Sequence, residues 1–211
     1  MSLKKVVEAA VGEIGKTENP PGSNMNEYGE RYGWNGVPWC VQFLWDSFDR
    51  GGERAAFFGG AKTASCGVLM QWYKEQGQLV PVKEAQRGDI GFFNFSGGKA
   101  PEHCGLIIEG RPGYVLSVEG NTTTTGGSED NGGAVAEKMR GYAYIVGVAR
   151  PKYQSEEPET KDDFTGRWSE GAIRWCLEKG LLTGYPDGSF RPAQAVTREE
   201  LAAVLRRLAE A

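Results

Sequence analysis

A cysteine and a histidine in this chain carry the chemistry needed to attack an amide carbonyl. Cys40 follows Pro38 and Trp39 and begins an apolar, helix-like run, "CVQFLW". A helix N-terminus and a nearby imidazolium both stabilise a thiolate, and together they lower the pKa of a thiol by several units. The chain contains one histidine, His103, so any Cys–His pair must use it. We predict that Cys40 and His103 form a nucleophile and its base; a packed core cysteine and a structural histidine are the competing interpretation.

A third residue must hold the imidazole in one tautomer and orientation. The strand expected after the one that His103 begins ends in "SVEGN", residues 117–121. Side chains alternate along a strand, so Ser117, Glu119 and Asn121 are expected on one face. Glu119 offers a carboxylate acceptor for an imidazole N–H, and Asn121 is the fallback. A solvated strand end is the alternative interpretation of Glu119.

The elements that must position these residues change from helical to strand-like along the chain. Apolar spacing predicts helices over Val6 to Ile14, 40–49 and 64–76. Short segments rich in β-branched and aromatic residues predict strands over 87–95, 103–110, 113–121 and 141–150. Helices followed by strands predict an α+β fold with an antiparallel sheet. The polar stretch 122–133 is expected to be a loop or a hairpin tip.

A change of composition divides the chain into two expected domains. Residues 151–163, "PKYQSEEPETKDD", are acidic and have almost nothing to bury, so they are expected to be a linker. This places one domain at 1–150 and a smaller helix–loop–helix unit at 164–211. In the smaller unit, Ser169 is expected to cap a helix that contains Cys176 in its core face. The sequence "TREE", residues 197–200, is expected to form a capping box that begins the second helix.

Composition and charge argue against several classes of partner. The formal net charge is −4 and no basic stripe is present, which argues against nucleic acid as the main partner and against a polybasic membrane anchor. No run approaches the roughly 20 apolar residues of a membrane span. Glu8 and Glu13 interrupt the N-terminal apolar stretch, where a secretory signal needs an unbroken core. The four cysteines lack C-x-x-C spacing, so they predict neither a zinc site nor a disulfide framework.

The order of motifs across residues 1–150 resembles the CHAP family of cysteine- and histidine-dependent amidohydrolases and peptidases. The similarity rests on "GVPWCVQFLW", "RGDIGFFNF", "HCGLIIEG" and "VEGNT", in that order. It implies a papain-like α+β fold and hydrolysis of amide bonds in bacterial peptidoglycan. By motif position it implies Cys40 as nucleophile, His103 as general base and Glu119 as the orienting residue. Asn121 stands at a position often associated with the family's active site.

The loop before Cys40 is expected to complete the site. A tetrahedral oxyanion would be bound by the Cys40 backbone N–H and one further donor. The candidates for that second donor are Tyr28, Tyr32 and Asn35. The aromatic residues of the same loop either line a groove for a sugar–peptide substrate or pack in the core; they are Tyr32, Trp34 and Trp39.

Metal ligands are scarce in the same loop. Some relatives in the CHAP family bind calcium through several aspartates just before the nucleophile, whereas residues 26–40 offer only Glu27 and Glu30 as carboxylates. Calcium needs many hard oxygen ligands. We therefore predict no calcium site, and no other metal or cofactor.

The segment 164–208 resembles the S-layer homology (SLH) family. The similarity rests on Phe164 and Trp168, the turn "GYPDGSFRP", and "TREE", in which Glu199 replaces the family's usual alanine. It implies binding of secondary polymers of Gram-positive cell walls, with Arg198 as the cationic contact and with Trp168, Gly184 and Tyr185 nearby. The alternatives are that Trp168 fills the small core and that Arg198 merely lies in a first helical turn. The family usually carries three repeats and this chain shows one, so we expect self-association through 164–211.

Together these features predict a modular peptidoglycan hydrolase, either a phage or prophage endolysin or a bacterial autolysin. It would act at the cell wall as an N-acetylmuramoyl-L-alanine amidase or as a cross-bridge endopeptidase. Without a visible secretory signal, we expect synthesis in the cytoplasm and release through a pore, unless a leader is missing from this sequence. Two alternatives remain: a non-catalytic wall-binding protein on a CHAP scaffold, and a cytosolic cysteine amidase acting on a small thiol–polyamine conjugate.

Overall fold

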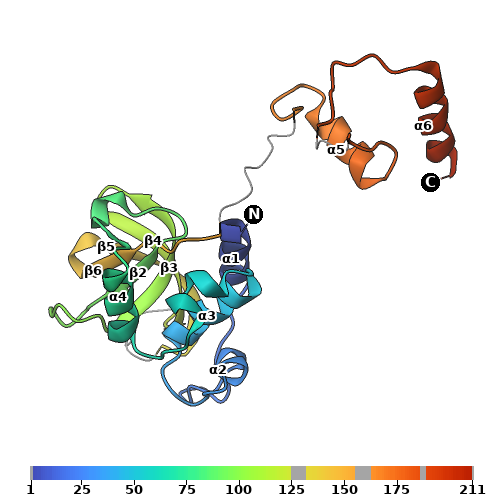
Figure 1. The fold of residues 1–211 in the computed structure, drawn as a ribbon. Coiled ribbons are helices and arrows are strands. Elements are labelled where there is room, and N and C mark those ends of the chain that lie inside the picture. The colour runs from blue at the N-terminus through green and yellow to red at the C-terminus, as the bar shows by residue number, and fades with distance from the viewer. Residues whose placement is uncertain (1, 125–131, 155–162, 186–188, 211) are drawn as a thin grey trace. The chain divides into compact units, whose positions relative to one another are not determined.

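The chain forms two compact units, residues 1–155 and 156–211, which are called the N-terminal and C-terminal units (Figure 1). The computed structural model describes residues 2–124, 132–154, 163–185 and 189–210. Most of the expected linker, from residue 155 to 162, and the centre of the expected polar loop, 125–131, lie outside the described residues. Each unit is considered by itself.

The N-terminal unit contains a six-stranded sheet in the order β1-β6-β2-β3-β4-β5. Every neighbouring pair of strands is antiparallel. The strands are β1 (Leu79–Val80), β2 (Ile90–Phe93), β3 (His103–Arg111), β4 (Tyr114–Thr122), β5 (Ala134–Gly141) and β6 (Ile145–Ala149). Helices that precede an antiparallel sheet confirm the predicted α+β class.

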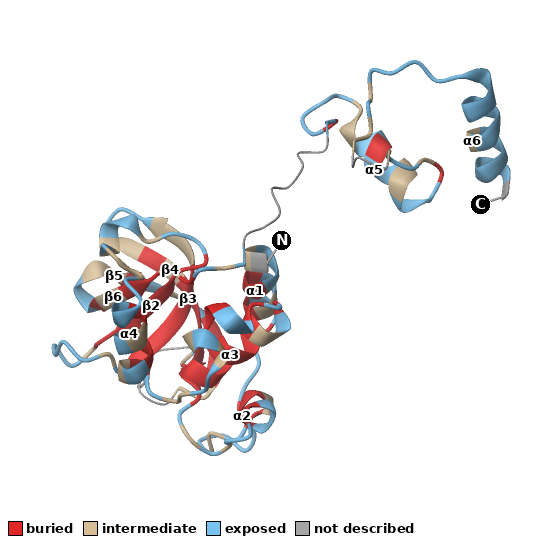
Figure 2. Ribbon diagram, in the orientation of Figure 1, coloured by how far each residue is buried: buried red, intermediate tan, exposed pale blue. Residues whose placement is uncertain are grey.

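Four helices come before most of the sheet: α1 (Ser2–Val11), α2 (Glu27–Tyr32), α3 (Cys40–Arg50) and α4 (Cys66–Glu75). Helix α3 is central, because every residue from Cys40 to Phe48 is buried. A helix that is buried on all sides belongs in the interior of a domain. Figure 2 shows this burial in α3 and in the strands beside it.

Two apolar clusters lie on the two faces of the sheet. The larger cluster joins α1, α3 and α4 to Phe92, Cys104, Leu106 and Val118. The smaller cluster contains Phe93, Ile107, Val115, Ile145 and Val148. Strand alternation explains the division, because Cys104 and Leu106 belong to the helix-side cluster while Ile107 belongs to the smaller one. The start of β3 therefore places Cys104 on the helix side, next in the chain to His103.

Several elements differ from the sequence prediction. Helix α1 ends at Val11, so Ile14 lies outside it and is 42% exposed. The predicted strand 141–150 begins with a 3-10 turn, Tyr142–Tyr144. Helix α2 was not expected because its six residues are too few to show a helical period; Asn26 caps it at the start and Gly33 at the end. Strand β5 was also not expected, since its charged residues obscure the alternation that marks a strand.

The C-terminal unit contains helices α5 (Glu170–Glu178) and α6 (Arg198–Glu210), as the helix–loop–helix prediction requires. The capping box is confirmed: Glu200 N–H donates to Thr197 Oγ1 at 3.1 Å, and Thr197 N–H donates to Glu200 Oε2 at 2.8 Å. Ser169 occupies the N-cap position of α5 as predicted, but its side chain makes no capping hydrogen bond. Cys176 is only half-buried. None of the helices in the described part of the chain is long and apolar enough to cross a membrane.

Candidate active site

Cys40 is the first residue of α3, as predicted from the apolar run that follows it. Trp39 occupies the N-cap position and offers no side-chain acceptor, so the first N–H groups of the helix are not capped by that side chain. Gly120 in β4 allows the start of α3 to approach the sheet. A Cβ atom at Gly120 would lie 2.5 Å from the Phe43 Cβ and 2.8 Å from the Trp39 ring. The close packing therefore fixes the Cys40 thiol beside the ends of the strands.

His103 and Glu119 form the predicted pair on neighbouring strands. Nε2 of His103 lies 3.0 Å from Oε2 of Glu119, and both residues are buried. The Ser117 hydroxyl donates to Oε1 of Glu119 at 2.6 Å, so Ser117 and Glu119 share a face of β4 as expected. Gly105 makes room for the carboxylate, because a Cβ at that position would lie 2.5 Å from Glu119 Cγ.

Arg140 completes this arrangement and was not predicted from the sequence. Its Nε donates to Glu119 Oε1 at 2.9 Å and its Nη2 donates to Oε2 at 2.5 Å. Two parallel bonds of this kind fix a carboxylate in one orientation. The guanidinium also lies over two rings, 4.7 Å from the Phe95 centroid and 5.5 Å from that of Phe93. Because the charged residues of β5 hide its alternation, nothing in the sequence places Arg140 beside Glu119.

These contacts set the charge state of the pair. Burial opposes ionisation of Glu119, but Arg140 and His103 outweigh it and hold the pKa of that carboxyl below its usual value. Burial likewise opposes protonation of His103, but hydrogen bonding to Cys40 and Glu119 raises its pKa to about 10. Contacts with Cys104, Cys66 and His103 lower the pKa of the Cys40 thiol well below its usual value. The arrangement therefore favours a thiolate–imidazolium pair at neutral pH, with Nδ1 of His103 left to serve the thiol.

Asn121 lies two residues after Glu119, near the end of β4. Its φ angle is 56°, in the left-handed region, and the pairing of β4 with β5 shifts register between Glu119 and Thr122. A register shift interrupts the alternation on which the prediction relied. Asn121 is buried, and its Oδ1 has no hydrogen-bond partner among the described residues.

The three candidates for the second oxyanion donor differ in what they can offer. The Tyr28 hydroxyl donates to Glu13 Oε2 at 2.9 Å, and the Tyr32 hydroxyl donates to the Thr63 carbonyl at 2.8 Å. Both protons are therefore committed inside the fold, contrary to the prediction. Oδ1 of Asn35 accepts bonds from two backbone N–H groups, which leaves its Nδ2 as a donor with no contact seen in the described residues.

The aromatic residues of the loop divide between core and surface. Trp39 is fully buried and stacks on Tyr28 with ring centroids 5.4 Å apart, and Tyr32 is also buried. The packing interpretation therefore holds for Trp39 and Tyr32, and the groove interpretation is wrong for both. Trp34 is 54% exposed and remains a candidate surface for substrate. Glu27, one of the two carboxylates considered for calcium, is paired with Lys16 and Arg31.

Among the described residues, one cluster could hold a metal ion, and it includes the candidate nucleophile. The Sγ atoms of Cys40, Cys66 and Cys104 lie within 4.8 Å of one another. The three residues come from three different elements, so the spacing of cysteines in the sequence does not predict the cluster.

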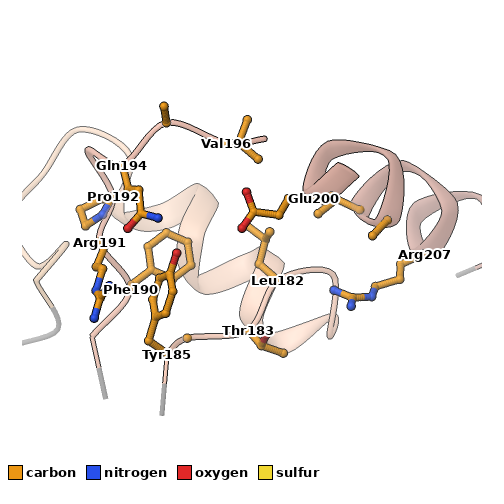
Figure 3. A pocket seen from close by; sticks show the side chains of 14 residues that line it. Leu182, Thr183, Tyr185, Phe190, Arg191, Pro192, Gln194, Val196, Glu200 and Arg207 are labelled. Carbon is orange, nitrogen blue, oxygen red and sulfur yellow. The ribbon is translucent and has the colours of Figure 1, made fainter. Parts of the chain in front are cut away.

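The C-terminal unit has a pocket of about 410 Å³ between the α5–α6 connection and α6 (Figure 3). Of the four residues predicted to bind wall polymer, Gly184 and Tyr185 line it, whereas Trp168 and Arg198 do not. Trp168 is 99% exposed, so the core-packing alternative is wrong for it. The pocket adds Arg191, whose guanidinium carbon lies 4.1 Å from the centroid of the Tyr185 ring.

Comparison with known proteins bears on the C-terminal unit. Residues 162–202 match the model of the S-layer homology domain. The chain is 38% identical over 61 residues to outer membrane protein SlpA of Deinococcus radiodurans, covering 29% of this chain and 5% of the relative. It is 31% identical over 116 residues to a cellulosome-anchoring protein of Acetivibrio thermocellus, covering 54% of this chain and 23% of the relative. It is 35% identical over 66 residues to S-layer protein EA1 of Bacillus anthracis, covering 31% of this chain and 8% of the relative. The chain thus spans less than a quarter of each of these relatives.

A solved structure also shows some similarity. The crystal structure of the wild-type endolysin LysIME-EF1 superposes with a TM-score of 0.40 and 18% identity, covering 72% of this chain and 65% of the other. A TM-score of this size does not establish a shared fold. The SLH match, by contrast, lies entirely within the C-terminal unit and includes none of the residues around Cys40.

Proposed function

We propose that the N-terminal unit is a cysteine-dependent hydrolase that cleaves an amide bond in peptidoglycan. One observation carries the chemistry: a buried Arg140–Glu119–His103 chain of hydrogen bonds, in which His103 also interacts with Cys40 at the start of a helix. A nucleophile, a base and an orienting group in this order are the elements of acyl transfer. The arrangement supports the papain-like interpretation of the fold.

The proposed reaction begins with attack of the Cys40 thiolate on the amide carbonyl. The Cys40 backbone N–H and Nδ2 of Asn35 are proposed to bind the oxyanion that forms. Protonated His103 gives its proton to the leaving amine, and the acyl group stays on sulfur. A water molecule, deprotonated by His103, then attacks the thioester, which releases the acyl group as a carboxylic acid and restores the thiolate–imidazolium pair. Glu119 holds the imidazole throughout, and Arg140 holds Glu119.

The C-terminal unit supports peptidoglycan as the substrate class. The relatives similar to this chain have names that place them at the cell surface, among them an S-layer protein and a cellulosome-anchoring protein. We propose that the C-terminal unit binds a secondary wall polymer through Gly184 and Tyr185 in the pocket and through the exposed Trp168 and Arg198. An enzyme attached to the wall in this way would act at the cell surface.

Self-association is proposed for the same unit. Leu201, Leu205 and Leu208 follow one another at helical spacing on α6 and are each about half exposed. Among its described residues, the unit buries only three apolar side chains, those of Phe164, Ile173 and Leu181. A repeat that leaves its apolar face uncovered gains stability by packing against neighbours.

Mass spectrometry of digested peptidoglycan tests the proposal. Walls from several Gram-positive bacteria are incubated with the wild-type chain and with Cys40→Ala. Products that depend on Cys40 support the enzyme, and their new ends identify the bond. Free muramic acid lactyl groups indicate an amidase, and new peptide amines indicate an endopeptidase. Absence of such products from all walls would overturn the proposal, and hydrolysis of a thiol–polyamine amide instead would favour the small-molecule alternative.

A further inference from the structure

We propose that Cys40, Cys66 and Cys104 together form a binding site for a thiophilic divalent cation, of which Zn²⁺ is the natural probe. The Sγ atoms of Cys40 and Cys66 are 3.6 Å apart, and all three Sγ atoms lie within 4.8 Å of one another. A tetrahedral zinc ion with Zn–S bonds of about 2.3 Å separates its sulfur ligands by about 3.8 Å. The three thiols therefore need to move by only a fraction of a bond length to share one ion.

The fold, rather than the local sequence, builds this cluster. Cys40 begins α3, Cys66 begins α4, and Cys104 is the second residue of β3. Each side chain faces the same helix-side core, which holds all three residues in one apolar cluster. Two cysteines suffice for a disulfide, whereas three converging thiols match the ligand set of a soft cation. This convergence favours metal binding over a simple cross-link.

The surroundings provide an entrance and a fourth ligand. Cys40 and Cys66 keep 5% and 7% of their surface exposed, while Cys104 has none, so an ion would enter from the side of Cys40 and Cys66. The fourth position would be filled by water or by His103, whose Nε2 is held by Glu119. A carboxylate that orients a histidine in this way is a usual second partner at zinc sites.

Occupation of the site would have a consequence for activity, and this consequence rests on the proposed function. Sulfur bound to zinc is no longer available to attack a carbonyl, so the ion and an acylating substrate would exclude each other. Zinc would then hold the enzyme inactive until a competing chelator removes it. The binding itself does not depend on what Cys40 does as a nucleophile.

Metal titration of the full reduced chain tests the site. Native mass spectrometry after addition of Zn²⁺ is expected to show one ion per chain. Co²⁺ is expected to give the visible bands of a tetrahedral ion and the ultraviolet charge-transfer bands of thiolate ligation. These spectra are recorded on the wild-type chain, so they do not depend on the folding of any variant. Absence of thiolate bands at saturating Co²⁺ would overturn the proposal.

Serine variants locate the ligands. Cys66→Ser and Cys104→Ser are expected to weaken Zn²⁺ binding by more than about 100-fold, since loss of a second-shell partner alone costs about 10- to 100-fold. Cys176→Ser is the matched control, because Cys176 lies in the C-terminal unit, away from the cluster. Near-ultraviolet circular dichroism checks that each variant is folded, and Cys66→Ala provides a second variant at the more exposed position. Equal affinity of folded Cys66 and Cys176 variants would contradict the assignment.

Because binding is measured without substrate, the two proposals fail separately. A chain that binds zinc through these thiols but releases nothing from peptidoglycan would keep the metal site and lose the enzyme. A chain that hydrolyses peptidoglycan but shows no thiolate-bound metal would keep the proposed enzyme and lose the metal site.

Discussion

The two units place their candidate functional residues in opposite environments. In the N-terminal unit, Glu119, His103 and Arg140 are buried and hydrogen-bonded to one another. In the C-terminal unit, Trp168 and Arg198 are exposed. Covalent chemistry needs charges held in a fixed orientation away from water, because polar interactions are stronger there. Binding of a polymer instead needs side chains at the surface, where the polymer can reach them. Substitutions at these buried residues of the N-terminal unit should therefore disturb stability and activity together, whereas those at Trp168 or Arg198 should affect polymer binding.

The largest expected effect follows from removal of the nucleophile. Cys40→Ala is expected to lower the rate of peptidoglycan hydrolysis by about 10⁴-fold or more, to background, because the acyl intermediate is proposed to form on the Cys40 sulfur. The rate of product release measured by mass spectrometry checks this, with circular dichroism showing that the fold is kept. Retained activity would remove Cys40 from the role of nucleophile.

Replacement of Glu119 by Gln is expected to slow hydrolysis by about 10²- to 10⁴-fold. The imidazolium supports catalysis while His103 is protonated, so wild-type activity should fall as pH rises through the His103 pKa of about 10. Without the carboxylate, His103 loses its proton more easily, and this alkaline limb should move to lower pH. A profile of kcat/KM against pH measures both effects. The control is Glu137→Gln, because Glu137 is an exposed residue of β5. If the alkaline limb of Glu119→Gln stayed at the wild-type pH, the orienting role of Glu119 would be rejected.

Arg140→Met tests whether the buried charges depend on one another. Removal of one partner from a buried ion pair is expected to cost about 3–5 kcal/mol of unfolding free energy, because Glu119 keeps a charge with less compensation. The matched variant is Arg111→Met, whose side chain is 54% exposed and which should change stability by less than about 0.5 kcal/mol. Urea unfolding followed by fluorescence compares the two. Equal losses of unfolding free energy in the two variants would show that the buried ion pair of Arg140 adds no more stability than an exposed one.

Self-association is expected for the C-terminal unit, in contrast to the buried site of the N-terminal unit. Light scattering at micromolar concentration is expected to give a mass above that of one chain, because α6 exposes a stripe of leucines. Leu205→Glu places a charge in that stripe and should return the chain to a monomer. A wild-type chain that is already monomeric would show that the stripe is not an interface.

The smallest effect is expected for Arg198→Ala. Loss of one exposed cationic contact should weaken co-sedimentation with cell walls by about tenfold, corresponding to about 1.4 kcal/mol. Activity on soluble peptidoglycan fragments should stay unchanged, because Arg198 lies in the other unit. Arg206→Ala, in the same helix, is the control. Equal sedimentation of the two variants would exclude a binding role for Arg198.

Much of the site could be predicted because the sequence leaves few choices. The chain has one histidine, so His103 is the only possible imidazole of a Cys–His pair. The apolar run after Cys40 predicts that a helix starts there, as it does. Period-two alternation placed Ser117 and Glu119 together. The same rule cannot be applied at Asn121, where the strand pairing shifts register and the backbone turns left-handed.

The remaining features depend on tertiary contacts that no local pattern encodes. Arg140 reaches Glu119 only because an unexpected strand pairs with β4. Cys66 and Cys104 meet Cys40 only because two helices and a strand begin at the same place. The sequence offers Tyr28 and Tyr32 as candidate oxyanion donors, but their hydroxyls donate to Glu13 and to the Thr63 carbonyl. In each case a partner distant in the chain decides the role of the residue.

The pH dependence of Cys40 alkylation tests the thiolate–imidazolium pair directly. Iodoacetamide is added to the full chain across a range of pH, and the labelled Cys40 peptide is quantified by mass spectrometry, with the unfolded chain as reference. Cys40 is expected to react as a thiolate at neutral pH, and its alkylation should slow only well below the pKa of about 8.5 that is usual for a free thiol. A rate that rises through about pH 8.5, as it does in the unfolded chain, would contradict the thiolate–imidazolium pair on which the proposed function depends.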